Sequence, residues 1–492
     1  MIMNNYIGID LGTSSVKMLL VSRDGEILKS VTREYPICYP KSGWSEQNPY
    51  DWYDATIDGL KELVANIDKT TVKGISFGGQ MHGLVILDES DSVIRPAILW
   101  NDGRTQKQTD YLNEVIGKDK LSAYTANIAF AGFTAPKILW VKENESENFA
   151  KISKIMLPKD YLAYRLSGAF ATDYSDASGM LLLDVENRAW SRQMCEICGV
   201  DENKLPKLYE SYEKIGTLIP SVARELGLDE TVAVSIGAGD NAAAAVGTGT
   251  VGNGSCNISL GTSGTVFVSQ DSFSVDKANA LHSFCHSNGK YHLMGCILSA
   301  ASCNKWFVED ILGTNDFANE EKNLDRLLGE NNTFFLPYLM GERSPHNDVD
   351  ARGAFIGMRP DTSREHMVLA VLEGVAFALR DCVEIAKSSG IKIDTTKICG
   401  GGGKSRIWRK ILANVLGIPV LRPQIEEGPS YGGAILAMVG CGEYDSVLEA
   451  TEKLIKTRDI TEPENALVAK YEEKYKAFTR LYPALKDVYK MI

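Results

Sequence analysis

The sequence predicts an α/β protein of two domains that share one design. Strand-like and helix-like segments alternate along the chain, which is the pattern of an α/β fold. The 492 residues exceed the size at which one hydrophobic core usually stops growing. The letters LGTS occur twice, at 11–14 and 260–263, each time between two strand-like segments. We therefore expect a first domain over 1–247, a second over 254–442 and a helical extension over 443–492.

The first half begins with a predicted antiparallel hairpin. YIGID and VKMLLVS read as strands joined by the LGTSS turn, and Asp24-Gly25 turns the chain into a third strand. A helix is predicted over YDWYDATIDGLKELVANI, followed by the apolar strand VKGISFGG. This strand and the later strand RPAILW end in polar residues, at Gln80 to His82 and at Asn101 to Arg104. Such positions are where open α/β sheets collect ligands.

The pattern restarts after a glycine-rich stretch near 247–256. Before it, TVAVSIGAGDNAAAAVG predicts a strand, a glycine turn, Asp240 and an alanine-rich helix. After it, ISLGTSGTVFVSQ overlays on the first hairpin without a gap. Further on, a strand ends in the glycines of ICGGGGKS, and Ser405 is the expected N-cap of a helix that Gly417 closes. The Walker phosphate-loop pattern fails there, because Ile398 stands where that pattern needs glycine.

Composition excludes several classes of function. The balance of 44% hydrophobic and 24% charged residues is that of a globular protein, and the net charge of −12 argues against a nucleic-acid surface. The sequence contains no apolar run long enough for a bilayer, and its first residues lack the features of a signal peptide. We expect a cytoplasmic protein that binds neither nucleic acid nor membrane.

The two LGTS loops are candidate phosphate-binding turns. Gly, Thr and Ser expose backbone N–H groups and hydroxyls with little side-chain bulk, which suits phosphate oxygens. One such loop alone fits a plain hairpin turn, whereas two copies on facing domains favour phosphate binding. Asp10 of the first copy corresponds to Ser259 of the second. A carboxylate beside phosphates needs a cation between them, so Asp10 is the candidate Mg²⁺ residue, directly or through water.

Asp240 is the candidate catalytic base. Its neighbouring glycines leave room for a ligand, and the helix that begins there favours an ionised carboxylate at neutral pH. In phosphoryl transfer an aspartate commonly accepts the proton of the attacking hydroxyl, and Asn241 beside it could hold the substrate. His82 is placed to contact a sugar hydroxyl, and Trp100, Asn101 and Asp102 are candidates to complete the pocket. Taken singly, Asp240 also fits a simple N-cap and His82 a packed structural histidine.

Two long segments carry a family resemblance. GFTAPKILWVKEN (Gly132 to Asn144) and GAFIGMRPDTSREHMVLAVLE (Gly353 to Glu373) resemble both signatures of the FGGY family of carbohydrate kinases. The segments WSEQNP, QMHG, RPAILWNDGR, LPKDYL, SLGTSG, HSFCH, LSAASC and FLPYLMGERSPHND resemble in particular its bacterial members that act on D-xylulose. The resemblance implies the actin-like, ribonuclease-H-like fold, with two ATPase-type domains flanking a deep cleft.

The resemblance also implies roles for individual residues. Asp240 matches the family's proton acceptor and Asp10 its second important acid, while Met81 and His82 match its sugar-contacting pair. The positions that match nucleotide-binding segments are Thr13, Ser14, Gly261, Thr262, Gly401, Gly402, Gly403 and Ser405, with Asn304 on the adenine side.

The activity that this resemblance implies is transfer of the γ-phosphoryl group of ATP to the 5-hydroxyl of D-xylulose, with Mg²⁺ near Asp10. The implied partner is a small-molecule sugar, and the oligomeric state stays open, with a homodimer among the alternatives. Two other functions remain open. The chain could phosphorylate another ketose or polyol, such as L-ribulose, glycerol or gluconate. It could instead be an actin-like or chaperone-like ATPase.

Overall fold

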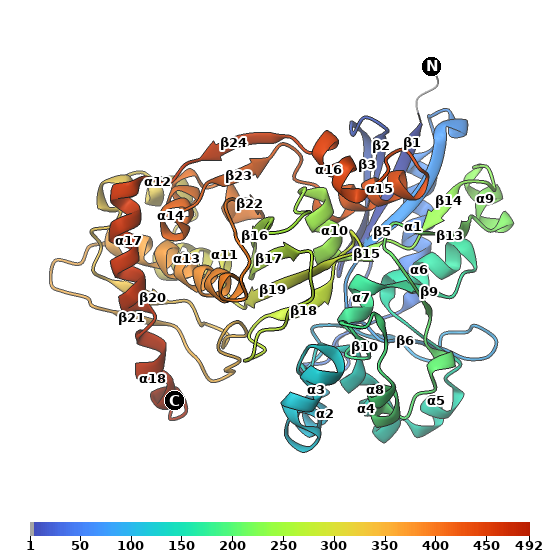
Figure 1. Cartoon of the computed structure of the whole chain (residues 1–492), viewed down its shortest axis with the longest axis horizontal. Helices are drawn as coiled ribbons and strands as arrows, with labels where there is room; N and C mark the ends of the chain where they lie inside the picture. Colours follow the sequence, from blue (N-terminus) through green and yellow to red (C-terminus); the bar gives the residue numbers. More distant parts are fainter. Residues whose placement is uncertain (1–3) are drawn as a thin grey trace.

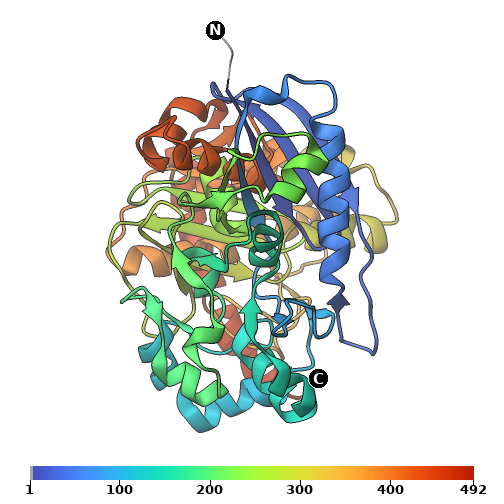
Figure 2. The same ribbon diagram turned by 90° about the vertical axis from the view of Figure 1, so that its right-hand side faces the viewer.

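The computed structural model describes residues 4–492 and has the predicted α/β architecture. Two seven-stranded mixed sheets lie side by side, each with helices packed on it (Figure 1). A largely helical part of the first half, between about residues 100 and 200, lies below the first sheet in Figures 1 and 2. Within residues 4–492, no helix is long and apolar enough to cross a membrane.

The first sheet is built around the predicted hairpin. Its main path is β13 (Lys214–Thr217), β14 (Ala233–Ser235), β5 (Val72–Gly79), β1 (Asn5–Leu11), β2 (Ser15–Ser22) and β3 (Ile27–Glu34), with β15 (Ala238–Gly239) also on β5. β1 is antiparallel to β2 and parallel to β5. Asp10 pairs across the hairpin with Lys17 and across the parallel pair with Gly78. The sheet therefore brings Asp10 to the same edge as the end of β5.

The second sheet repeats this design. Its order is β18 (His282–Cys285), β19 (Tyr291–Ile297), β17 (Gly264–Gln270), β16 (Cys256–Leu260), β22 (Thr396–Cys399), β23 (Val420–Pro423) and β24 (Thr457–Thr461). β16 is antiparallel to β17 and parallel to β22, as β1 is to β2 and β5. The two LGTS loops thus occupy equivalent turns of two similar sheets, as the repeat predicted.

Two helices join the halves of the molecule. α10 (Asp240–Gly247) packs on α15 (Gly428–Gly440), and α15 lies on β1 and β5 although it comes from the second half of the chain. This close approach requires a glycine at position 8, because a Cβ there would lie 1.8 Å from the Ser430 carbonyl oxygen. The first sheet is therefore covered partly by a helix that follows the second sheet in sequence.

The remaining helices cover the two sheets and form the lower part of the first half. Their bounds in the first half are α1 (Pro49–Leu63), α2 (Gln106–Asp110), α3 (Lys118–Thr125), α4 (Thr134–Asn144), α5 (Ser146–Lys151), α6 (Pro158–Ser167), α7 (Tyr174–Ser178), α8 (Arg192–Cys198) and α9 (Pro220–Leu226). In the second half they are α11 (Ala301–Lys305), α12 (Phe317–Glu321), α13 (Arg364–Ser388), α14 (Arg406–Leu416), α16 (Val447–Leu454), α17 (Asn465–Phe478) and α18 (Leu481–Tyr489).

Short strands complete the fold. They are β4 (Glu46–Gln47), β6 (Val85–Leu87), β7 (Ala97–Ile98), β8 (Lys154–Met156), β9 (Ala171–Asp173), β10 (Leu183–Asp184), β11 (Ala189–Trp190), β12 (Lys207–Tyr209), β20 (Phe334–Leu336) and β21 (Ala354–Ile356). The segment 443–492 contains β24 as well as helices, and Tyr471 and Phe478 of α17 are buried in the core of the second half.

Candidate active site

A cavity of about 320 Å³ collects most of the predicted sugar-site residues. Met81, His82, Trp100, Asp240 and Asn241 line it from the first half of the chain. From the second half come the loop residues Ser259, Gly261, Thr262 and Ser263. The cavity therefore lies between the two halves, with the candidate base on one wall and the second LGTS loop on the other.

A larger cavity, of about 800 Å³, adjoins the same loop at Thr262. It is lined by predicted nucleotide residues, namely Thr262, Asn304, Gly401, Gly402 and Ser405. Thr262 lines both cavities, so the two cavities meet at the second LGTS loop. This arrangement places a nucleotide-sized space next to a sugar-sized one.

Asp240 is the first residue of α10, at the helix start that the sequence predicted. Its Oδ1 accepts hydrogen bonds from Asn241 N at 2.7 Å and Asn241 Nδ2 at 2.9 Å. Burial nevertheless raises the pKa of its carboxyl from 3.8 to about 6, with the Asn241 bonds opposing the shift. The group is still mostly ionised at neutral pH, as expected, and is more basic than an exposed aspartate.

The glycines beside Asp240 serve packing. A Cβ at Gly239 would lie 2.9 Å from the Met81 sulfur, and Gly237 has a φ of 77° and lies against the Phe77 backbone. They thus allow close approach of other parts of the protein, rather than the approach of a ligand that the sequence suggested.

Asp10 lies at the end of β1. Burial, together with the negative charge of Asp240, raises the pKa of its carboxyl from 3.8 to about 7. Lys17 opposes this shift, but Lys17 is itself ion-paired with Glu427. Asp10 therefore lacks a full counter-charge, which is the setting in which a carboxylate gains most from a bound cation.

His82 has a left-handed backbone, with a φ of 70°. Its Nδ1 lies 2.8 Å from the Gly179 carbonyl oxygen, and its own carbonyl accepts a hydrogen bond from the buried Lys137 at 2.8 Å. Burial lowers the pKa of the imidazole to about 3, so the ring is neutral. With Nδ1–H donating to Gly179, the Nε2 atom is left as an acceptor for a hydroxyl in the cavity.

The first LGTS loop contacts the sugar cavity through Trp100. The Trp100 indole donates to Thr13 Oγ1 at 3.0 Å, and Trp100 lines the cavity. Thr13 and Ser14 are not themselves among the lining residues of either cavity, and neither is the exposed Asn101. Asp102, also a candidate for the pocket, is instead buried against Arg104, whose Nη2 donates to it at 2.7 Å.

The third glycine loop begins α14 as predicted. Ser405 Oγ accepts from Trp408 N at 3.1 Å and donates to Glu321 at 2.7 Å, and Gly417 ends the helix with a φ of 67°. A Cβ at Gly401 would meet nothing within 4 Å, so this position faces open space in the larger cavity. Gly403 is buried and does not line the cavity; its carbonyl accepts from Arg409.

Several lining residues were not predicted. Phe130, Phe133, Met294, Cys296 and Arg343 also line the sugar cavity. Phe133 and Arg343 lie within the segments GFTAPK and GERSPHND, so the family resemblance itself could have indicated them. In the nucleotide-sized cavity the unpredicted residues include Lys305, Glu309, Phe317, Glu321 and Trp408.

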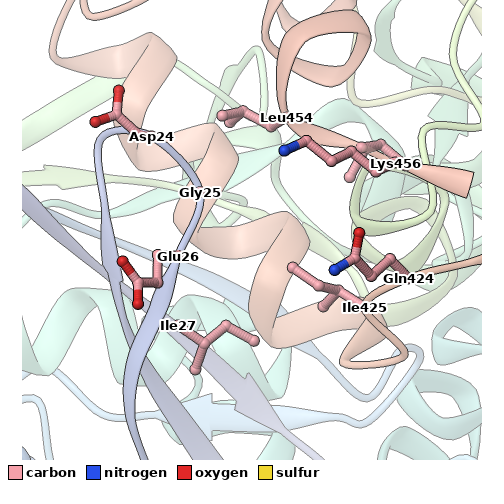
Figure 3. A pocket seen from close by; sticks show the side chains of 9 residues that line it. Asp24, Gly25, Glu26, Ile27, Gln424, Ile425, Leu454 and Lys456 are labelled. Atoms are coloured by element: carbon pink, nitrogen blue, oxygen red, sulfur yellow. The ribbon is translucent and has the colours of Figure 1, made fainter. Parts of the chain in front are cut away.

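A further pocket, of about 370 Å³, lies apart from both cavities. It is formed by the β2–β3 turn, the start of the β23–α15 connection and the chain between α16 and β24 (Figure 3). None of the predicted site residues lines it, so it plays no part in the site described above.

Two domains with similar sheets and adjoining cavities define a class of two-domain α/β proteins with a ligand site between the domains. Comparison with known proteins makes the class specific. Residues 5–247 match the N-terminal domain of the FGGY family of carbohydrate kinases, and residues 256–441 match the C-terminal domain of that family. The chain belongs to the FGGY family and is a carbohydrate kinase.

Individual relatives are similar over nearly their whole lengths. The chain is 38% identical to the xylulose kinase of Bacillus subtilis, covering 99% of this chain and 98% of that protein. It is 39% identical to the xylulose kinase of Escherichia coli, covering 98% and 99%. A crystal structure described as a "xyloylose kinase" from Brucella ovis superposes with a TM-score of 0.93 at 40% identity, covering 99% of this chain and 100% of that one.

Proposed function

We propose that this kinase transfers the γ-phosphoryl group of ATP to the 5-hydroxyl of D-xylulose, giving D-xylulose 5-phosphate and ADP. The observation that carries the proposal is the position of Thr262, which lines both the nucleotide-sized and the sugar-sized cavity. The choice of sugar is supported by relatives named as xylulose kinases at 38% and 39% identity.

The sugar would lie between His82 and Asp240. The neutral His82 ring offers an acceptor to a sugar hydroxyl, and Asn241 lies beside the carboxylate that would face the reacting hydroxyl. Asp240 then takes the proton of that hydroxyl as the oxygen attacks phosphorus. A pKa of about 6 lets Asp240 be ionised at neutral pH and still be a stronger base than an ordinary aspartate.

The larger cavity fits the nucleotide. Gly401 leaves open space on its face, and the buried Asn304 Oδ1 has no hydrogen-bond partner among the described residues. The backbone N–H groups and hydroxyls of Gly261 and Thr262 are the donors proposed for the phosphates. Thr13 and Ser14 are proposed to approach the transferring phosphoryl group from the other wall of the cleft.

Asp10 is the residue proposed to hold Mg²⁺, directly or through water. Its carboxyl lacks a full counter-charge, and the described residues contain no cluster of three or more metal-ligating side chains. One carboxylate plus nucleotide phosphates is the usual way in which proteins hold this ion. When bound, Mg²⁺ neutralises charge on the phosphate oxygens.

The test is ADP release from ATP with D-xylulose, L-ribulose, glycerol and gluconate offered separately. We expect the highest kcat/KM with D-xylulose and little ADP release without a sugar. Faster turnover of another sugar would overturn the choice of D-xylulose. Equal turnover with and without sugar would overturn the assignment of sugar as acceptor.

A further inference from the structure

We propose that Arg343 binds the C1–C2 hydroxyketone end of the sugar and so selects an open-chain ketose. This inference rests on the proposed function. Arg343 comes from the second half of the chain, yet it lines the sugar cavity together with His82 and Asp240. Its role is that of a specificity residue that the second half contributes to the substrate site.

The backbone around Arg343 is held tightly. Its N–H donates to Glu342 Oε1 at 2.7 Å, and the same oxygen accepts from Leu298 N at 2.9 Å. On the other side, Cys296 N donates to Ser344 Oγ at 3.1 Å, and Ser344 N donates to the Cys296 carbonyl at 2.9 Å. These bonds fix the residue beside the end of β19, facing the cavity.

The N–H donors of the Arg343 guanidinium group are available to a ligand. Its carbon lies 5.1 Å from the centroid of the Phe130 ring, which belongs to the first half of the chain. Among the described residues, no side chain forms an ion pair or hydrogen bond with it. An arginine that lines a cavity with its five N–H donors unused is suited to bind ligand oxygens, and its fork matches two oxygens at once.

The position of Arg343 in the cavity indicates which end of the sugar it meets. The Phe130 ring over which Arg343 lies is 5.4 Å from the Phe133 ring, and the Phe133 ring is 4.7 Å from the His82 ring, centroid to centroid. Arg343 therefore lies toward the His82 end. If the 5-hydroxyl lies at Asp240, the opposite end of a five-carbon sugar faces Arg343.

An open-chain 2-ketose offers the Arg343 guanidinium two neighbouring oxygen acceptors. A five-carbon 2-ketose closes its furanose ring through its 5-hydroxyl oxygen, so a molecule with a free 5-hydroxyl and an open chain also has a free C2 carbonyl. That carbonyl oxygen can only accept hydrogen bonds, and it lies next to the C1 hydroxyl oxygen. A guanidinium fork can bind both, which favours the open-chain ketone.

The test compares Arg343→Ala and Arg343→Lys with wild type, using Arg359→Ala as the matched control because Arg359 is exposed and lies outside the cavity. Removing a charged hydrogen-bond donor should raise the KM for D-xylulose roughly 10- to 100-fold, with a smaller change in kcat and none in the KM for ATP. Arg343→Lys should restore part of the loss. Xylitol, which lacks the carbonyl, should bind nearly as well to Arg343→Ala as to wild type.

Two results would overturn the inference. An unchanged KM for D-xylulose in a folded Arg343→Ala protein would show that Arg343 does not bind the sugar. A fall in kcat with an unchanged sugar KM would place Arg343 at the transferring phosphoryl group instead. Absence of D-xylulose turnover in the wild-type enzyme would refute the proposed function itself. The wild-type measurement therefore tests the proposed function, and the variants test the role of Arg343.

Discussion

Replacing Asp240 with asparagine should make the protein more stable at alkaline pH while removing its activity. The amide keeps the Oδ1 atom that accepts from Asn241 but carries no charge. The pKa of the carboxyl rises from 3.8 in an exposed chain to about 6 in the fold. A shift of roughly two pKa units corresponds to about 3 kcal/mol, and because Asp240 is partly exposed we expect about 1 to 3 kcal/mol.

The sign follows from which form the fold prefers. A raised pKa means that the folded protein favours the neutral acid, so ionisation costs stability above pH 6 and costs nothing below the unfolded value of 3.8. Urea unfolding should therefore show Asp240→Asn more stable than wild type at pH 8, with the advantage shrinking as the pH falls toward 4. Asp91→Asn is the control, and its effect should have the opposite sign, because hydrogen bonds from Lys154 and Tyr164 lower the pKa of Asp91.

The activity of the same variant tests the catalytic role. Loss of a general base should lower kcat about 10²- to 10⁴-fold in a protein that remains folded. Near-normal turnover would refute the role of Asp240 as proton acceptor. Equal or lower stability than wild type at pH 8 would refute the reasoning about its buried charge.

The remaining predictions concern the rest of the site. In a pH profile, kcat/KM should fall about tenfold per pH unit below about 6, as Asp240 becomes protonated; a profile flat to pH 4.5 would contradict this. Asp10→Asn should raise the Mg²⁺ concentration needed for half-maximal activity on the order of 10- to 100-fold, and an unchanged Mg²⁺ titration would remove Asp10 from the metal site. Gly401→Ala should leave the thermal unfolding midpoint unchanged and raise the KM for ATP. Gly402→Ala should lower the midpoint, because its Cβ would lie 2.6 Å from Leu260 Cγ. The reverse pattern would contradict the assignment of Gly401 to the nucleotide cavity. Ser405→Ala should cost about 1 kcal/mol in urea unfolding through loss of the cap on α14, and no measurable loss would show that the cap does not matter.

Local sequence features predicted the framework well. The hairpin β1–β2–β3 and its copy β16–β17 follow from turn residues set between apolar strands, and the N-cap of α14 follows from Ser405. These features depend on neighbours within a few residues, so their physical causes are visible in the sequence.

The composition of the site was harder to predict, because its walls come from distant parts of the chain. Arg343 and Cys296 reach the cavity only because the second half folds against the first, and no local pattern encodes that approach. Asp102 shows the opposite case. Asp102 follows the end of a strand, as ligand-binding residues often do, but its carboxylate accepts hydrogen bonds from Arg104, two residues later. The raised pKa of Asp240 likewise arises from burial, which the helix start alone could not indicate.

The most direct test of the account is the position of the new phosphate on the sugar. D-Xylulose labelled with ¹³C at C5 is incubated with ATP, Mg²⁺ and the enzyme, and the product is examined by ³¹P and ¹³C NMR. The account predicts a phosphate coupled to the labelled C5, formed by wild type and not by Asp240→Asn. A phosphate on another carbon, or inorganic phosphate with no sugar product, would contradict it.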